Sequence, residues 1–271
     1  MKDLQILESQ LSTFEFLENW KNQGYNIIPV KHWADISSDI PVYCFSDLTH
    51  EFVRTWLNNN QLAIYGGRGY VGNHLYKQRW LSRFSVNGWA NTILKPIPFS
   101  RWNNMKLPRH PWKVNKVKNI LIAPSKATSS YWPPQYPEGW AAHMTTMFAG
   151  ANVKIRWKAK TPGLRWMTLW EDLEWADLVV SQSSAITAEA FWYGKKVIST
   201  EPCTTWAAQK TSIEDWEDPT EPKLRDHWHE HLAWCQYTEK EFVSGEFLNL
   251  LTQYLGPIEQ YSSGHTYNMI S

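Results

Sequence analysis

The sequence predicts an α/β protein of two similar units, each a parallel sheet with helices on its faces. Helical and strand-like segments alternate along the 271 residues, which is the order that βαβ units produce. The alternation stops between Pro96 and Pro111, where four prolines and no clear periodicity predict a linker, and then resumes. We therefore expect an N-terminal unit at residues 1–112, which includes a basic linker, and a C-terminal unit at residues 113–271 that ends in a helix.

The first unit is expected to begin with an amphipathic helix over residues 4–22, because its leucines and phenylalanines recur near helical spacing. Strands are predicted at residues 25–30, 41–45 and 61–65. Between the last two, Asp47 is suited to cap a helix that runs to Leu57. This order of elements favours a parallel sheet.

Glycines at positions 66, 67, 69 and 72 follow the third strand with the spacing G-G-x-G-x-x-G. The spacing resembles a dinucleotide-binding fingerprint, but the next residues are too bulky and charged for a closely packed helix. A flexible active-site loop is the better interpretation, and Arg68 would then reach an acceptor.

The second unit shows a more regular alternation. Its expected strands are residues 119–123, 153–157, 178–181 and 197–199. A helix from Ser184 to Tyr193 lies between the last two, and Gly194 is suited to end it. Residues 239–255 have a helical pattern and form the expected C-terminal helix.

Charge is distributed unevenly along the chain. Residues 52–137 contain thirteen lysines and arginines and no aspartate or glutamate, although the whole chain has a net charge of only +1. Tryptophans are interleaved with these charges, a mixture that suits phosphates paired with cations and bases or sugars stacked on rings. The alternative is a basic face that is balanced by an acidic face elsewhere in the fold.

Bulk composition excludes several classes of protein. No segment approaches the ~20 apolar residues that span a bilayer, and the N-terminus lacks a signal-peptide pattern, so we expect a cytoplasmic protein without a membrane partner. The three cysteines are far apart and form no CxxC pair, so neither a disulfide framework nor a structural zinc is indicated.

The sharpest local signal lies at residues 172–199. A strand ends at Ser181, and a turn of small hydroxyl residues then opens a helix, whose first backbone N–H groups can bind a phosphate. Ser183 and Ser184 can cap the helix or donate to a ligand. Glu189 lies about one and a half turns inside, where its carboxylate can accept hydrogen bonds from sugar hydroxyls. The alternative is an ordinary capped helix in a parallel sheet.

A second loop of the same unit suits phosphate. It runs from Pro124 to Ser130 after the first strand and offers Ser125, Lys126 and Ser129 as donors. Because ligands of open α/β sheets bind at the carboxyl ends of the strands, both loops should face one crevice. A lysine and several hydroxyls beside a helix start outline a nucleotide-diphosphate site.

These segments resemble the nucleotide-binding half of GT-B glycosyltransferases, which have two facing Rossmann-like domains with the nucleotide-sugar in the cleft between them. The resemblance covers about 80 residues and rests on VKIRWK at 153–158, Ala176-Asp177 before the strand, the Ser183-Ser184 turn, Glu189 and GKKVI at 194–198. Two departures are Lys196 in place of the usual proline, and Val197 in place of the second acid of an E-x7-E pair, which disfavours a retaining enzyme of that type.

The resemblance implies a donor site and a co-substrate. The donor-binding candidates are Ser125, Lys126, Ser129, Arg156, Lys158, Ser183, Ser184 and Glu189. The co-substrate would be a nucleotide-sugar such as UDP-glucose, and a metal is not indicated.

In GT-B enzymes the N-terminal half binds the acceptor, and in this chain that half carries the basic block. Two segments of this half, GGRGYVGNHLYKQRW and RFSVNGW, resemble compact phage-encoded proteins of this architecture. A cationic acceptor half with interleaved tryptophans is similar to that of the phage DNA glucosyltransferases, which modify hydroxymethylated pyrimidines. The implied reaction transfers a hexose to such a base in duplex DNA, flipped into an aromatic pocket. The acceptor-binding candidates are Arg68, Arg79, Arg83, Trp89 and Arg101. The catalytic base is expected among Asp35, Asp47 and His74, with His50 and Glu51 as further candidates.

Two alternatives stay open. The acceptor could be a surface glycan or another acidic carbohydrate, or the chain could be a non-catalytic nucleic-acid-binding protein that kept the fold.

A last cluster, DHWHEH at residues 226–231, has the composition of a metal site but not the HExxH spacing, so a structural or surface role is expected for it.

Overall fold

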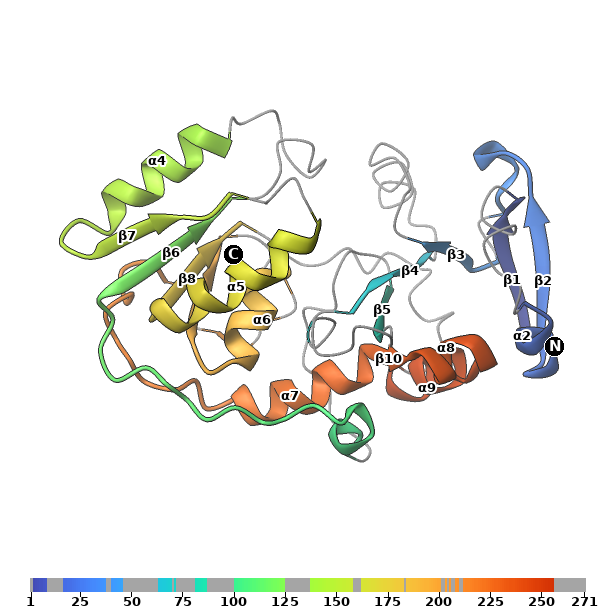
Figure 1. Ribbon diagram of the computed structural model, residues 1–271. Helices are drawn as coiled ribbons and strands as arrows, with labels where there is room; N and C mark the ends of the chain where they lie inside the picture. Colours follow the sequence, from blue (N-terminus) through green and yellow to red (C-terminus); the bar gives the residue numbers. More distant parts are fainter. Residues whose placement is uncertain are drawn as a thin grey trace.

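The structure is a computed structural model, and it contains two α/β units that lie side by side (Figure 1). It describes residues 2–8, 17–37, 40–45, 63–69, 71, 81–86, 100–124, 137–157, 162–182, 184–200, 203, 205, 208–209 and 212–255. Each unit is built on its own sheet, of six and four strands. The chain is therefore an α/β protein of two Rossmann-like units, as the alternation of segments predicted.

The first sheet has the strand order β10-β5-β4-β3-β1-β2. Its strands are β1 (Lys2–Leu7), β2 (Tyr25–Val30), β3 (Val42–Phe45), β4 (Ala63–Arg68), β5 (Leu81–Val86) and β10 (Gln236–Thr238). The pairs β1–β2, β1–β3 and β3–β4 are parallel, whereas β4–β5 and β5–β10 are antiparallel. The predicted strands at 25–30 and 41–45 are confirmed.

The start of the chain differs from its prediction. Lys2–Leu7 forms a strand that lies between β2 and β3, and only Leu17–Asn22 of the expected helix is helical, as α2. A strand that is buried on both faces has a continuous apolar run rather than an alternating one, and such a run also fits one turn of a buried helix. Gln5, buried in this strand, holds the next loop by donating to the carbonyl oxygens of Ser37 and Ile40.

The glycine-rich segment also differs. Gly66 and Gly67 are strand residues of β4, opposite Phe84 and Arg83 of β5, so the expected flexible loop is wrong at these positions. Arg68 is the last residue of β4 and pairs with Ser82. A glycine in a strand interior was difficult to foresee, because glycine weakens a strand and usually indicates a turn.

The second sheet is parallel throughout, with the order β7-β6-β8-β9. Its strands are β6 (Asn119–Ala123), β7 (Asn152–Ile155), β8 (Leu178–Ser181) and β9 (Lys196–Ser199), all close to their predicted ranges. Helix α4 (Pro137–Met147) packs on one face, while α5 (Pro162–Trp175) and α6 (Ile186–Trp192) pack on the other. Alternation along β8 divides its side chains, with Val180 toward α4 and Val179 toward α5 and α6.

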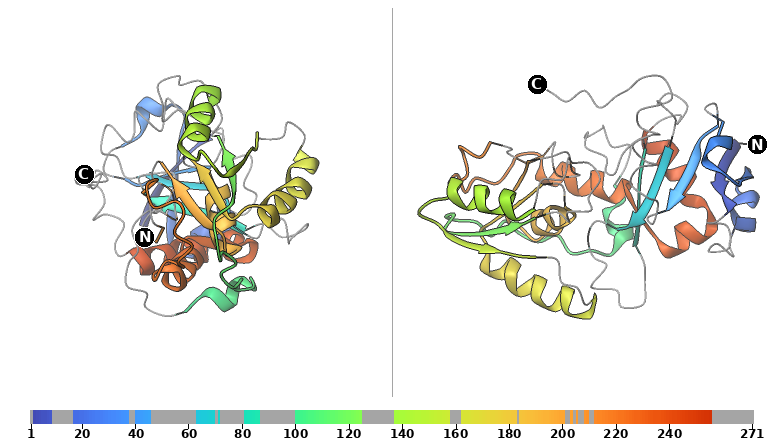
Figure 2. Two further views of the ribbon diagram at one scale, coloured as in Figure 1. Left: turned by 90° about the vertical axis from the view of Figure 1, so that its left-hand side faces the viewer. Right: turned by 90° about the horizontal axis from the view of Figure 1, so that it is seen from above.

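The C-terminal segment crosses back to the first unit. Helix α7 (Arg225–Trp234) extends between the two units, and β10 then pairs with β5 (Figures 1 and 2). Helices α8 (Glu239–Ser244) and α9 (Glu246–Leu255) pack on the first sheet. The sequence placed residues 236–255 with the second unit, so this assignment is corrected, although the predicted helical character of residues 239–255 is confirmed.

A tryptophan of the first unit fixes the junction between α8 and α9. Gly245 adopts φ 81° there, and a Cβ at this position would lie 2.8 Å from a ring atom of Trp20. The same indole donates its Nε1 hydrogen to the carbonyl oxygen of Phe242 at 2.9 Å.

In the described part of the chain, no helix has the length and apolar character that a membrane span requires.

Candidate functional site

The carboxyl ends of β6 and β8 are neighbours in the second sheet. Ala123 pairs with Ser181, and the Ser181 hydroxyl donates to the Ala123 carbonyl oxygen at 2.7 Å. The chain leaves β6 toward β7 on one side and returns to β8 on the other, so this is the topological switch point at which open α/β sheets bind ligands. Both loops that the sequence selected begin here, one after Ala123 and one after Ser181. We call this border of the sheet the donor edge.

A chain of buried polar groups lies behind the donor edge. The Ser199 hydroxyl donates to the Gln182 carbonyl oxygen. Thr205 Oγ1 donates to Gln209 Oε1 at 2.7 Å and lies 3.0 Å from Cys203 Sγ. The Ser199 bond joins the end of β9 to the residue after β8, and Gln209 Nε2 donates to the Ser199 carbonyl oxygen at 3.5 Å, which links a described residue beyond β9 to the same strand end.

The Ser184–Glu189 segment lies directly after β8. Helix α6 begins at Ile186, two residues later than predicted, so Ser184 precedes the helix. The Ser184 hydroxyl accepts from the Ile186 backbone N–H at 3.4 Å, and its carbonyl oxygen accepts from the Thr187 hydroxyl at 2.8 Å. Glu189 is only 3% exposed inside α6. A carboxylate so deeply buried is unusual for a helix that only covers a sheet.

Arg156 extends the donor edge to β7. It is the first residue after that strand, and its backbone N–H donates to the Ile122 carbonyl oxygen at 2.8 Å, which continues the ladder with β6. Its guanidinium Nη1 binds Asp172 Oδ2 and lies 3.1 Å from Thr168 Oγ1, both on α5. Asp172 also binds Lys154 through its other oxygen.

The sequence did not select Asp172 or Thr168 as site residues. Their spacing of four places them on one face of α5, and Lys154 and Arg156, two apart, lie on one side of the chain at β7. These two spacings were the available signal. It could be recognised only once the side of β7 that α5 covers was known.

Several expected site residues lie outside the described residues. They are Ser125, Lys126, Ser129, Lys158 and Ser183 of the donor set, Asp47, His50, Glu51 and His74 of the catalytic set, and Arg79 and Trp89 of the acceptor set. For Arg68 and Arg83 only the strand backbone is described. Asp35 lies exposed in the short helix η1 (Trp33–Asp35) after β2, the edge strand of the first sheet.

Arg101 does not fit contact with an acceptor. Its side chain is 2% exposed, binds Glu241 at 2.8 Å and donates from Nε to the Ala233 carbonyl oxygen at 3.1 Å. The guanidinium carbon lies 5.2 Å from the centre of the Trp234 ring. Arg101 therefore binds the C-terminal helices to the linker, and we leave it out of the acceptor set.

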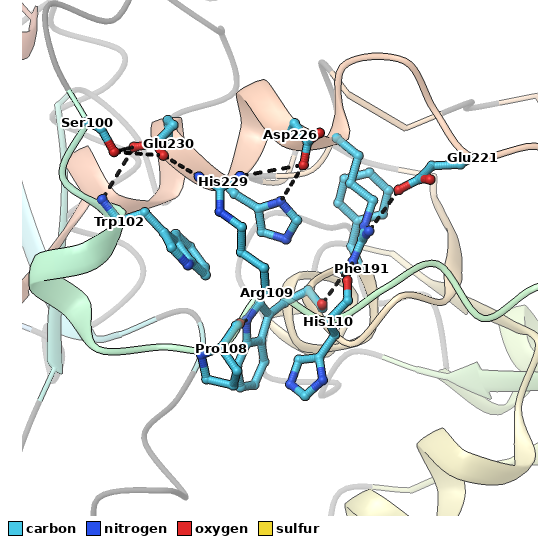
Figure 3. Close-up of polar contacts among 12 residues, drawn as sticks. Ser100, Trp102, Pro108, Arg109, His110, Phe191, Glu221, Asp226, His229 and Glu230 are labelled. Carbon is cyan, nitrogen blue, oxygen red and sulfur yellow. Dashed lines mark hydrogen bonds and ion pairs between the residues drawn. The ribbon is translucent and has the colours of Figure 1, made fainter.

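Two crossing segments join the units, residues 100–113 and residues 219–235, and together they form what we call the connecting arm (Figure 3). Glu230 of α7 accepts from the Ser100 hydroxyl at 3.0 Å and from the Trp102 backbone N–H at 3.3 Å, and it also binds Arg109. Trp102 opens the short helix η2 (Trp102–Met105), so Glu230 satisfies a donor at its start.

The other end of the arm is fixed by Arg225. Its Nη2 donates to the carbonyl oxygens of His110 at 2.8 Å and Trp192 at 3.0 Å, and its Nε donates to that of Phe191 at 3.0 Å. Lys113 adds an ion pair to Glu174 of α5 at 3.6 Å. Part of the basic block is thus balanced by acids from other segments, which is the alternative that the sequence left open.

The DHWHEH cluster belongs to this arm. His229 is buried between the rings of Trp102 and Trp228, and burial, followed by the nearby Arg225, Arg109 and His110, lowers its pKa to about 3. Among the described residues no group of three His, Cys, Asp or Glu side chains could hold a metal ion. The contacts of Asp226, His229 and Glu230 agree with the expected structural role.

Comparison with known proteins gives weak similarities only. No family model matches the chain, and no curated protein matches it. Among solved structures, the chain is similar to KpsC of Thermosulfurimonas dismutans described as a beta Kdo 2,7 transferase, with 10% identity, coverage of 92% of this chain and 99% of that one, and a TM-score of 0.47. The beta Kdo 2,4 transferase of the same KpsC gives 9% identity, 93% and 98% coverage and a TM-score of 0.46. The transcription regulator CcpA of Lactococcus lactis gives 11% identity, 95% and 92% coverage and a TM-score of 0.24. At these values the similarities assign no activity.

Proposed function

We propose that the chain is a glycosyltransferase that binds its nucleotide-sugar donor at the donor edge of the second sheet. The observation that carries this proposal is the pairing of Ala123 with Ser181, because the two phosphate-suited segments follow these neighbouring strand ends at a topological switch point. Arg156 supplies a cation at the end of β7, and we propose that Glu189, a buried carboxylate of α6, binds the sugar or ribose hydroxyls. Cations for a diphosphate and a carboxylate for hydroxyls are what a nucleotide-sugar requires.

The proposed chemistry is direct displacement at the anomeric carbon of the sugar. A base on the first unit removes the proton of the acceptor hydroxyl, and the cations of the donor edge stabilise the charge that develops on the leaving diphosphate. Asp35, Asp47 and His74 remain the proposed candidates for the base, and Lys126 and Arg156 for the cations. The donor is proposed to be a UDP-hexose such as UDP-glucose.

For the acceptor we propose hydroxymethylated pyrimidines in duplex DNA. This part of the proposal rests on two observations. Residues 52–137 contain thirteen basic residues and no acidic residue, and the first unit resembles phage proteins. Three described cations of the block, Arg101, Arg109 and Lys113, have acidic partners, so we propose that DNA contact is made by other cations of the block.

Donor binding is tested by isothermal titration of the full chain with UDP and UDP-glucose. We expect binding by the wild type and a dissociation constant raised about tenfold or more in Glu189→Gln, because a buried carboxylate that accepts sugar hydroxyls loses charge-assisted hydrogen bonds. Glu246→Gln, the same change on α9 of the other unit, should bind as the wild type. Absence of binding of any nucleotide-sugar by the folded wild type would falsify the proposal.

The acceptor is tested separately by transfer of labelled glucose from UDP-glucose. Hydroxymethylated duplex DNA, the same duplex without the modification, and an acidic polysaccharide are compared at low and high salt. We expect label only in hydroxymethylated DNA, with binding that weakens steeply as salt increases. Label in the polysaccharide instead would refute the DNA acceptor and leave the glycosyltransferase proposal standing.

A further inference from the structure

One carboxylate holds two basic side chains at the β7 end of the donor edge. Asp172 Oδ1 binds the Lys154 ammonium and Oδ2 binds the Arg156 guanidinium, and the Asp172 side chain is only 6% exposed. The side chain of Lys154 is 51% exposed and that of Arg156 is 12% exposed. The cluster therefore keeps one net positive charge, and its less exposed cation is the one at the end of the strand.

Arg156 is held by one backbone hydrogen bond and by two side-chain contacts to its guanidinium. Its backbone N–H continues the ladder to Ile122 at 2.8 Å, which sets where the side chain starts. Asp172 and Thr168, one helical turn apart on α5, both contact the same nitrogen, Nη1. A planar group held at one nitrogen by two partners has lost most of its rotational freedom before a ligand arrives. Binding then costs less entropy.

We propose that Asp172 is a positioning residue for the donor, acting through Arg156. It holds the guanidinium at the carboxyl end of β7 so that Arg156 meets the diphosphate of the nucleotide-sugar at the switch point. This inference rests on the proposed function, because it assigns a role within the same donor site. It goes further by naming a residue on α5 that the donor motif does not contain.

A purely structural function of the cluster makes a different prediction. If Asp172 only attached α5 to β7, its replacement would lower stability and leave nucleotide affinity unchanged. If it positions Arg156, replacement weakens phosphate binding, and this effect disappears when Arg156 is already absent. A double-mutant cycle on affinity therefore separates the two roles.

The experiment measures the dissociation constant of UDP by isothermal titration, with the unfolding midpoint of each free protein measured alongside. Asp172→Asn, Arg156→Met and their double variant are compared with the wild type. We expect each single variant to raise the dissociation constant about tenfold, and the double variant to bind no more weakly than Arg156→Met alone.

The matched control is Asp177→Asn at the opposite edge of the same sheet. The Asp177 carboxylate accepts from the backbone N–H groups of Lys118 and Asn119 at 3.0 and 2.9 Å, so its loss lowers stability but leaves UDP affinity within about twofold. If Asp172→Asn does not fold, Thr168→Val takes its place. It removes the smaller contact to Nη1 and should raise the dissociation constant about threefold.

The outcomes separate this inference from the proposed function. The positioning role is overturned if Asp172→Asn binds UDP as tightly as the wild type. It is also overturned if Asp172→Asn lowers UDP affinity by the same factor when Arg156 is already replaced. In both cases the proposal of donor binding stands. Failure of the wild type to bind any nucleotide or nucleotide-sugar overturns both.

Discussion

The donor edge and the connecting arm both gather charged and polar side chains, but they use them differently. In the arm, Arg101, Arg109 and Arg225 are each bound by acids or backbone carbonyls of a segment far away in the sequence. At the donor edge, polar groups converge on strand ends from which two loops depart, and Arg156 is held there by α5. The arm pairs these arginines within the fold, whereas the cluster of Lys154, Arg156 and Asp172 at the donor edge keeps one net positive charge.

The difference shows that local charge density does not identify a binding surface by itself. The block of thirteen basic residues contains two, Arg101 and Arg109, whose acidic partners lie more than 100 residues further along the chain. Position relative to the end of a parallel strand is the property on which the proposed donor site rests, because ligands of open α/β sheets bind there.

The largest expected effect concerns the contact between the second unit and the arm. Gly194 has φ 88°, its carbonyl oxygen accepts from Lys113 N at 2.9 Å, and a Cβ at this position would overlap the Pro111 carbonyl oxygen. Gly194→Ala should therefore cost about 4 kcal/mol or more, measured by urea unfolding.

Gly150→Ala is the matched control for that substitution. Gly150 has φ 95° but nothing within 4 Å of a Cβ, so only the backbone strain of about 1–2 kcal/mol remains. Equal losses of unfolding free energy in the two variants would show that the Pro111 carbonyl oxygen does not contact the second unit closely at Gly194.

The next effect tests the buried ion pair of the arm. Arg101→Met should cost about 3 kcal/mol in urea unfolding, because Glu241 loses its partner and the Ala233 carbonyl oxygen loses its donor. Adding Glu241→Gln should recover part of this loss. No recovery in the double variant would mean that the pairing is not the source of the loss.

Titration of His229 gives a smaller effect. Its pKa is about 3 in the fold against an ordinary 6.5, so the folded state favours the neutral ring. The unfolded chain binds more protons between these values, hence this stability is complete above about pH 6.5 and decreases as pH falls toward 3. Between about pH 7.5 and about pH 5 the wild type should lose about 2 kcal/mol from this group.

His229→Phe keeps the edge-on contacts with Trp102 and Trp228 but cannot titrate. Its urea midpoint should therefore change less over the same pH range than that of the wild type. The charged neighbours Arg225, Arg109 and Asp226 stay in place, and His110 titrates in both proteins, so the comparison isolates one ring. Identical pH profiles would contradict the assignment.

The smallest effect is expected at the rim of the arm. The Arg109 side chain is 43% exposed, and its pairs with Asp226 and Glu230 are accessible to salt. Arg109→Gln should change stability by less than about 1 kcal/mol, and less again at high salt. A loss as large as that of Arg101→Met would show that the arm holds its exposed and buried pairs equally tightly.

Sequence could predict the two central strands of the second sheet because each contains a short apolar run between polar or proline residues. β6 and β8 were placed at their observed residues. It could not predict β10, since Gln236–Thr238 becomes a strand only by pairing with β5, some 150 residues earlier. In the proposed donor site, Ser184, Glu189 and Arg156 followed from motif and resemblance. Asp172 required knowledge of which side of β7 is covered by α5.

The return of the C-terminal segment to the first sheet has a consequence for synthesis on the ribosome. Gln236–Thr238 completes that sheet, and Phe242, Phe247 and Leu251 fill its core beside Trp20. A nascent chain can close the second sheet once β9 has emerged, but the first must wait for residues 236–255. The unit that is translated first is thus finished last, and until then its unpaired β5 edge and apolar face are open to chaperones and to aggregation.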